Sequence, residues 1–202
     1  MRPNPFIDVL TFLAKPDILT IVFWFLLVGG FGIAITVWRS EPAQRSARTI
    51  GVWVARLLIG AMWWQQSLWK VPPNYSGLLY WMKQEVAHAA IPLQSQLVGS
   101  VVIPHIDFFG PLVYAIEATI GISLIVGIFT RLGALLGVLM GLNLWLGLYS
   151  APGEWPWTYF FLITIQFLFL LDPPGYCLGA DALLRRQATA QWFGRWHALA
   201  KL

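Results

Sequence analysis

Charged residues are scarce in this chain of 202 residues. Only 11% are Asp, Glu, Lys or Arg, whereas 58% are hydrophobic and 12 are tryptophan. That composition excludes a soluble catalytic module and is typical of an integral membrane protein. The net charge of +4 is better explained by basic residues that orient helices against anionic lipid than by a nucleic-acid-binding surface.

Cysteine and histidine are equally rare. The single cysteine, Cys177, excludes an internal disulfide or a Cys-x-x-Cys redox pair and is interpreted as a small buried hydrophobic residue. All three histidines lie outside the long apolar segments, which excludes a haem held within the membrane by two histidines. A metal site built from His88, His105, Asp107 and Glu154 matches no strong ligand spacing, so no metal is predicted.

Long apolar runs fill most of the remaining sequence. A spanning helix needs about 20 mostly apolar residues, and five segments are predicted to cross the membrane: residues 17–38, 50–69, 108–129, 132–149 and 157–171. The last segment is short, and the aromatic and proline residues that flank it would lie at the interfaces. The predicted fold is all-α, a four-helix membrane bundle with one extra N-terminal transmembrane helix.

Basic residues outside these segments predict the orientation. With five crossings, one side carries eight Lys and Arg residues and the other carries four, which places the N-terminus outside and the C-terminus in the cytoplasm. The first apolar run is longer than the core of a signal peptide, so it is expected to be retained. Residues 77–90, on the outer side, are predicted to form an amphipathic helix that inserts Leu78 and Met82 into lipid.

Three units follow from this layout. Residues 1–49 form the N-terminal transmembrane helix and a cytoplasmic loop, 50–188 form the four-helix bundle, and 189–202 form an amphipathic tail. The N-terminal helix has no charge between Ile18 and Trp38. Because it also has no polar face to turn toward a bundle, the 17–38 helix is a candidate docking surface for other membrane-protein subunits as well as for the lipid bilayer.

Ionisable residues at membrane depth are costly, so each is a functional hypothesis. The periodicity of the second segment places Arg56, Trp63 and Lys70 on one face, which predicts that this face lies inside the bundle. The predicted interior polar cluster consists of Arg56, Glu117, Asn143 and Gln166. We expect Arg56 to pair with Glu117, either as a bond between helices or as part of a catalytic site.

A second group of candidates lies at the predicted outer mouth of the bundle. Flat aromatic rings beside amide and ammonium donors would suit a quinone ring or a small oxyanion. The candidates are Trp63, Trp64, Gln66, Trp69, Lys70, Glu154, Trp157 and Tyr159. An aromatic belt at the lipid headgroups would contain the same residue types, so both interpretations stay open.

Several short motifs resemble the DoxX/DoxD-like membrane proteins: Ala55 to Gly60 leading to Trp69-Lys70, Glu117 to Gly121 with Gly127, Thr130 to Gly133, and Gly179 to Asp181. The resemblance spans residues 50–186 and implies a small four-helix protein of a bacterial or archaeal cell (inner) membrane. The DoxD branch is the membrane subunit of thiosulfate:quinone oxidoreductase. Its matching positions imply the catalytic candidates Arg56, Lys70, Glu117, Arg131 and Asp181.

Two functions therefore stay open. The first is a membrane subunit of a quinone-linked oxidoreductase, which would join electron transport through a partner subunit. Its candidate cofactor is quinone, and no covalently bound group is predicted. The second is a non-catalytic accessory or structural subunit of a respiratory or photosynthetic membrane complex, which would pack against partner helices and shape the access of lipid and quinone.

Overall fold

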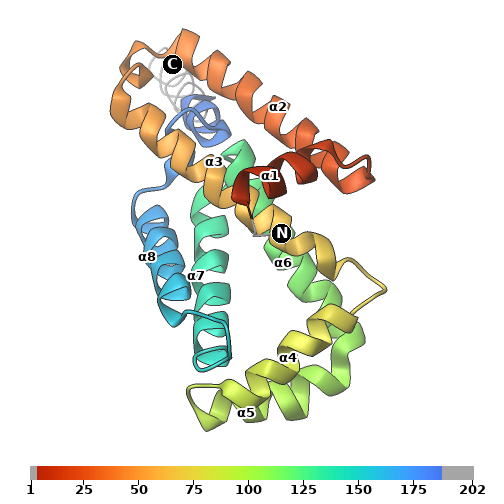
Figure 1. The fold of residues 1–202 in the computed structure, drawn as a ribbon. Coiled ribbons are helices and arrows are strands. Elements are labelled where there is room, and N and C mark those ends of the chain that lie inside the picture. Colours follow the sequence, from red (N-terminus) through yellow and green to blue (C-terminus); the bar gives the residue numbers. More distant parts are fainter. Residues whose placement is uncertain (1–3, 188–202) are drawn as a thin grey trace, which may run out of the picture.

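The computed structural model describes residues 4–187, and all regular structure within that range is helical (Figure 1). The α-helices are α1 Pro5–Ala14, α2 Ile18–Ser40, α3 Ala47–Ser67, α4 Ser76–His88, α5 Pro92–Leu97, α6 Ile106–Val126, α7 Thr130–Gly147 and α8 Pro156–Leu171. Short 3-10 or π-helical segments are η1 Pro42–Gln44, η2 Leu68–Lys70, η3 Val98–Val102, η4 Ile103–His105 and η5 Pro174–Tyr176. Residues 180–187 are also helical.

Four helices form the bundle that the sequence predicts. α3 packs on α6, α6 on α7, and α7 on α8. Their shared core contains Trp63, Ile120, Leu124, Ala134 and Phe169. α3 and α6 approach so closely that a Cβ atom added to Gly60 would lie 2.8 Å from the Ile125 nitrogen. Glycine therefore sets the spacing of this helix pair.

Two glycines of α7, Gly137 and Gly141, face α8, whereas Gly133 faces Ser123 of α6. A Cβ atom on Gly137 would lie 2.5 Å from the Gln166 side chain, and one on Gly141 would lie 2.9 Å from Ile163. The missing side chains allow the two helix backbones to approach. The interior of the bundle is therefore narrow between α7 and α8.

The N-terminal region contains one helix more than the sequence predicts. α1 spans 10 residues and begins where Asn4 accepts a hydrogen bond from the Phe6 nitrogen at 3.0 Å. α2 begins after Asp17, whose carboxylate caps the Thr20 nitrogen at 2.8 Å. α2 then packs along α6, where a Cβ atom on Gly30 would lie 2.9 Å from the Ile125 oxygen. The predicted extra helix thus lies against the bundle.

Three helical stretches among the described residues are long and apolar enough to cross a membrane: α2, the continuous run Pro92–Val126, and α7. α8 is apolar but shorter, at 16 residues. The chain is therefore a helical membrane protein with several candidate spans, and the topology with five spans stays a prediction.

α4 and the α5–η3 segment lie across one end of the bundle (Figure 1). α4 confirms the helix predicted over residues 77–90, but its apolar face does not point to lipid as expected. Leu78, Met82 and Val98 are buried against one another, because α5 and η3 fold back over that face. The predicted tail 189–202 lies outside the described residues.

Candidate functional site

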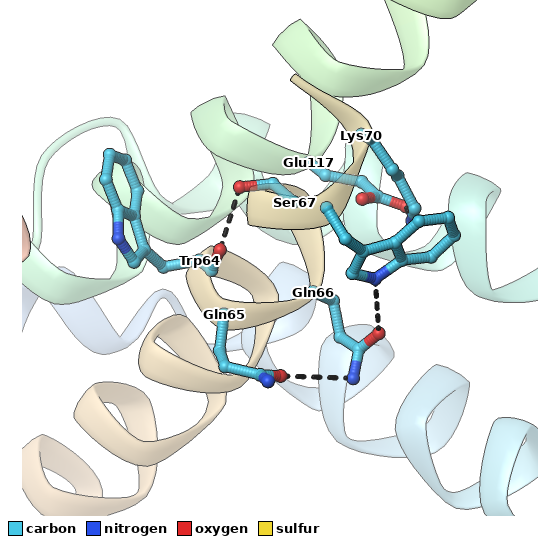
Figure 2. A network of polar contacts seen from close by, with 7 residues as sticks. Trp64, Gln65, Gln66, Ser67, Lys70 and Glu117 are labelled. Carbon is cyan, nitrogen blue, oxygen red and sulfur yellow. Dashed lines mark hydrogen bonds and ion pairs between the residues drawn. The ribbon is translucent and has the colours of Figure 1, made fainter. Parts of the chain in front are cut away.

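Lys70 and Glu117 form an ion pair inside the bundle (Figure 2). Lys70 ends the 3-10 turn η2 that follows α3, and Glu117 lies on α6. Their side chains are only 7% and 1% exposed, so both charges are removed from water. The second carboxylate oxygen of Glu117, Oε2, is buried and has no hydrogen-bond partner among the described residues.

The predicted pairing of Arg56 with Glu117 is wrong. Arg56 and Lys70 share a face, but 14 residues at 1.5 Å each separate them by about 21 Å along the helix axis. α6 runs past α3 with Glu117 level with Lys70 and with its C-terminal end level with Arg56. The prediction that Arg56 and Lys70 share a face was correct. The position of Glu117 along α6 determines that it pairs with Lys70 and not with Arg56.

Arg56 instead binds backbone carbonyls. Its side chain is fully buried, and it donates to the oxygens of Leu124 at 2.5 Å, Ile125 at 3.3 Å and Leu178 at 3.5 Å. Carbonyls in the last turn of a helix lack partners within the helix and carry partial negative charge. Arg56 therefore caps the C-terminal end of α6, just before Gly127 turns the chain with a φ of 76°.

Asp181 has the complementary role at the start of α7. Its carboxylate accepts hydrogen bonds from the Phe129 nitrogen at 2.7 Å, the Thr130 nitrogen at 3.0 Å and the Thr130 hydroxyl at 2.6 Å. These donors belong to the N-terminal end of α7, where a negative charge is favourable. The structure thus gives Asp181 a capping role, far along the bundle from Lys70.

A second buried carboxylate, Glu85, was missed by the sequence reasoning. It is 7% exposed and packs against α7, where a Cβ atom on Gly147 would lie 2.7 Å from it. Burial raises the pKa of Glu85 to about 7, and the neighbouring Gln94, Lys70 and Asn143 oppose that rise. A sequence signal existed, because Glu85 follows Leu78 and Met82 at helical steps of four and three.

Asn143 belongs to the same group of polar residues as Glu85 and does not contact Arg56. Its side-chain oxygen accepts a hydrogen bond from Gln94 Nε2 at 2.8 Å. Gln94 is itself 8% exposed, so α5 and α7 are joined by a largely buried amide pair. Together with Lys70 and Glu117, these residues place buried polar side chains at the end of the bundle covered by α4 and α5.

Gln166, the fourth member of the predicted cluster, lies deep on α8. It is fully buried, and neither atom of its amide has a hydrogen-bond partner among the described residues. The indole nitrogen of Trp63 is likewise buried without a partner. Arg56, Glu117 and Gln166 of the predicted polar cluster are therefore buried and Asn143 is partly buried, but the four residues lie in separate places and do not form one network.

The tryptophans at the end of α3 and in η2 lie in different surroundings: two are in the apolar core, and one is next to Lys70. Trp63 and Trp64 are 2% and 4% exposed and lie in separate apolar clusters. Trp69 is partly exposed, and the Lys70 ammonium lies 4.6 Å from its ring centroid. The Trp69 indole nitrogen donates to Gln66 Oε1 at 3.4 Å.

At the start of α8, the Tyr159 hydroxyl donates to Glu154 Oε2 at 2.7 Å. Trp157 is 54% exposed and its ring packs edge-on against Phe160. These contacts lie within the segment 154–160, whereas Trp69 contacts Gln66 and Lys70 and packs beside Gly77 of α4. Convergence of the two groups on one pocket therefore stays a prediction.

Arg131 lies in the first turn of α7, at the opposite end of that helix from Asn143 and Gly147. It is exposed and lines a surface groove together with Leu135, Leu170 and Tyr176. The five catalytic candidates thus occupy both ends of the bundle, with only Lys70 and Glu117 in direct contact. Across residues 4–187, no group of three or more His, Cys, Asp or Glu residues has the arrangement of a metal site.

The fold and the site define a class: a helical membrane protein that encloses ionisable side chains within a narrow bundle. Residues 51–150 match the sequence profile of the DoxX family, which supports a DoxX-like family for this chain. The match runs from α3 to α7 and includes Arg56, Lys70, Glu85 and Glu117. Among curated proteins and solved structures, none matches this chain.

Proposed function

We propose that this chain is the membrane subunit of a quinone-linked oxidoreductase of the thiosulfate:quinone type. The buried Lys70–Glu117 pair carries the proposal, because ionisable residues at membrane depth are expensive and commonly mark proton or ligand paths. The pair has a spare acceptor, Glu117 Oε2. Glu85 lies near enough for the charge of Lys70 to lower its pKa.

Quinone chemistry needs groups of this kind. Reduction of a quinone to a quinol takes up two electrons and two protons, and the protons must reach the ring oxygens inside a membrane. In the proposed reaction thiosulfate is oxidised at the outer face, and its electrons reach the quinone through the complex. Lys70 would donate a hydrogen bond to a ring oxygen, and Glu117 and Glu85 would relay protons from the α4–α5 end.

A second candidate function is a non-catalytic subunit of a respiratory or photosynthetic complex. The same ion pair favours it in one respect: Lys70 and Glu117 neutralise each other and join η2 to α6. An ion pair of that kind can have a purely structural role, in which it fixes two helices relative to each other. The two functions differ in what happens when both charges are removed together.

The test uses membranes that contain the full chain and its native partners, with thiosulfate as donor and decylubiquinone as acceptor. Glu117→Gln should lower quinone reduction on the order of 100-fold, a typical loss for a proton-transfer group. Asp107→Asn is the matched control, because Asp107 is an exposed carboxylate on the same helix. Its activity should equal that of the wild type.

The double variant Lys70→Gln/Glu117→Gln separates the two candidates. It removes both charges at once, so we expect it to recover the thermal stability that each single variant loses. Under the oxidoreductase proposal, its quinone reduction stays low. Full activity in the double variant, or no thiosulfate-dependent quinone reduction in wild-type membranes, would favour the non-catalytic subunit.

We further propose that the chain lies in a bacterial or archaeal inner membrane with its N-terminus outside and its C-terminus in the cytoplasm. Support comes from the basic residues gathered at one end of the described bundle: Arg39, Arg45, Arg48, Arg131, Arg185 and Arg186. Single cysteines at Pro3 and Ala190, in a Cys177→Ala background, should react with an impermeant maleimide from opposite faces. Labelling from the same face would contradict this orientation.

Partner subunits are proposed to pack against α2. Its outer side carries a line of exposed apolar residues: Phe25, Val28, Phe31 and Ile35. Co-purification of other subunits in mild detergent, lost on Val28→Lys and kept on the corresponding change at Leu139 of α7, would support that surface. Equal loss from both variants would indicate general damage to membrane insertion.

A further inference from the structure

A groove runs along the surface between α7 and α8 at the end of the bundle that carries Arg56 and Asp181. Its volume is about 510 Å³, within the range of ligand sites. Most of its wall is apolar, formed by Phe129, Leu132, Leu135, Leu170 and Pro173. The first turn of α7 and the last turn of α8 border it, so the groove lies where these two helices begin and end.

The groove is lined by one basic and one acidic side chain, Arg131 and Asp181, beside Thr130 and Tyr176. Arg131 is exposed and, among the described residues, has no hydrogen bond or ion pair. Asp181 also borders the groove, but three hydrogen bonds from Phe129 and Thr130 occupy its carboxylate. The Arg185 guanidinium lies 5.3 Å from the centroid of the Tyr176 ring.

We propose that this groove binds an anionic phospholipid, with the phosphate at Arg131 and one acyl chain along Leu132, Leu135 and Leu170. A guanidinium matches a phosphate through paired N–H donors. An acyl chain would cover the leucine side chains that line the open groove. Basic pockets between helices at the cytoplasmic surface are typical sites for anionic headgroups. This inference is independent of the quinone chemistry proposed for Lys70 and Glu117.

The test is a lipid titration of the purified full chain in mild detergent, followed by native mass spectrometry. The probes are dioleoyl phosphatidylglycerol and dioleoyl phosphatidylcholine. The first phosphatidylglycerol should bind about fivefold more tightly than phosphatidylcholine, as expected for one basic residue near a headgroup. Arg131→Gln should abolish that preference, whereas Arg39→Gln, an exposed arginine at the end of α2, should keep it.

A second pair of variants tests the apolar part of the groove. Leu135→Trp would fill the groove and should weaken the binding of both lipids without changing the charge of the protein. Leu139→Trp is its control, because Leu139 is exposed on the next turn of α7 and does not line the groove. Unchanged thermal unfolding in all four variants would show that the fold is intact.

Three outcomes would overturn the proposal. Equal losses in Arg131→Gln and Arg39→Gln would show that a diffuse basic surface attracts the lipid. Displacement of phosphatidylglycerol by inorganic phosphate at the same concentration would show that the site takes a free anion. Displacement by decylubiquinone would assign the groove to quinone.

Discussion

The two ends of the bundle stabilise their buried charges in different ways. At the Arg56 end, formed by Arg56, Thr130 and Asp181, each charged side chain binds backbone groups at a helix terminus. At the Lys70 end, formed by Lys70, Glu85 and Glu117, charged side chains meet other side chains. At the Arg56 end, the charged side chains therefore bind unpaired backbone groups at helix termini. At the Lys70 end, the buried charged side chains make no such bonds to the backbone of the described residues.

This difference separates structural from functional candidates among residues of similar burial. At the Arg56 end, the terminal guanidinium nitrogens and the Asp181 carboxylate bind carbonyls and N–H groups that the fold must satisfy in any case, and the atom there that lacks a partner among the described residues is a donor, Arg56 Nε. The Lys70 end retains a free carboxylate oxygen, Glu117 Oε2. We therefore expect variants at the Arg56 end to act mainly on stability, and variants at the Lys70 end to act on stability and activity together.

The largest loss of stability is expected from Arg56→Leu. Three carbonyls would lose their donor inside the bundle, which costs about 5 kcal/mol in total. The yield of monodisperse protein on size-exclusion chromatography should collapse. Arg56→Lys should rescue part of it, since an ammonium group can reach some of the carbonyls. Arg48→Leu is the control, because its ion pair with Asp172 is exposed; an equal collapse there would contradict the capping role.

The next largest effect is expected from breaking the ion pair at the Lys70 end. Lys70→Met or Glu117→Leu alone leaves one uncompensated buried charge and should destabilise the protein by about 4 kcal/mol. The double variant should lose much less than the sum of the two. Thermal unfolding of all four proteins in detergent measures this coupling. Additive losses would mean that the two side chains do not interact in the folded protein.

Glu85 should make stability depend on pH. Because its folded pKa of about 7 lies above its ordinary value of 4.5, the folded state binds more protons than the unfolded state between these values. Stability should therefore fall as the pH rises from about 4.5 to 7, by up to about 3 kcal/mol. Glu85→Gln should remove most of that fall in a series of melting temperatures. A slope that persists in Glu85→Gln would assign it to another group.

The smallest effect is expected from Asp181→Ala at the Arg56 end. Loss of a capping carboxylate should cost about 2 kcal/mol and leave quinone reduction per folded molecule unchanged. Asp181→Asn should cost less, since its oxygen still accepts one hydrogen bond. A fall in specific activity in either variant, with the melting temperature unchanged, would contradict the expectation that the Arg56 end acts mainly on stability.

Helical periodicity predicted correctly that Arg56, Trp63 and Lys70 share an interior face, since all three are buried. Glu117 and Gln166, which were expected inside because of their depth in the membrane, are 1% and 0% exposed. Periodicity did not predict α1, because ten residues before Lys15 and Pro16 are too few for a span. It also misplaced the apolar face of α4, which is buried by α5 and η3.

Composition and the length of its apolar runs by themselves determined that this chain is a helical membrane protein, and periodicity determined which face of α3 turns inward. Only the tertiary structure decided which charges meet. A helical period fixes the direction of a side chain around its own axis, but the partner depends on the height at which the next helix crosses and on the turn between them. The 3-10 turn η2 carries Lys70 to Glu117, while the end of α6 meets Arg56, and neither relation is encoded within one helix.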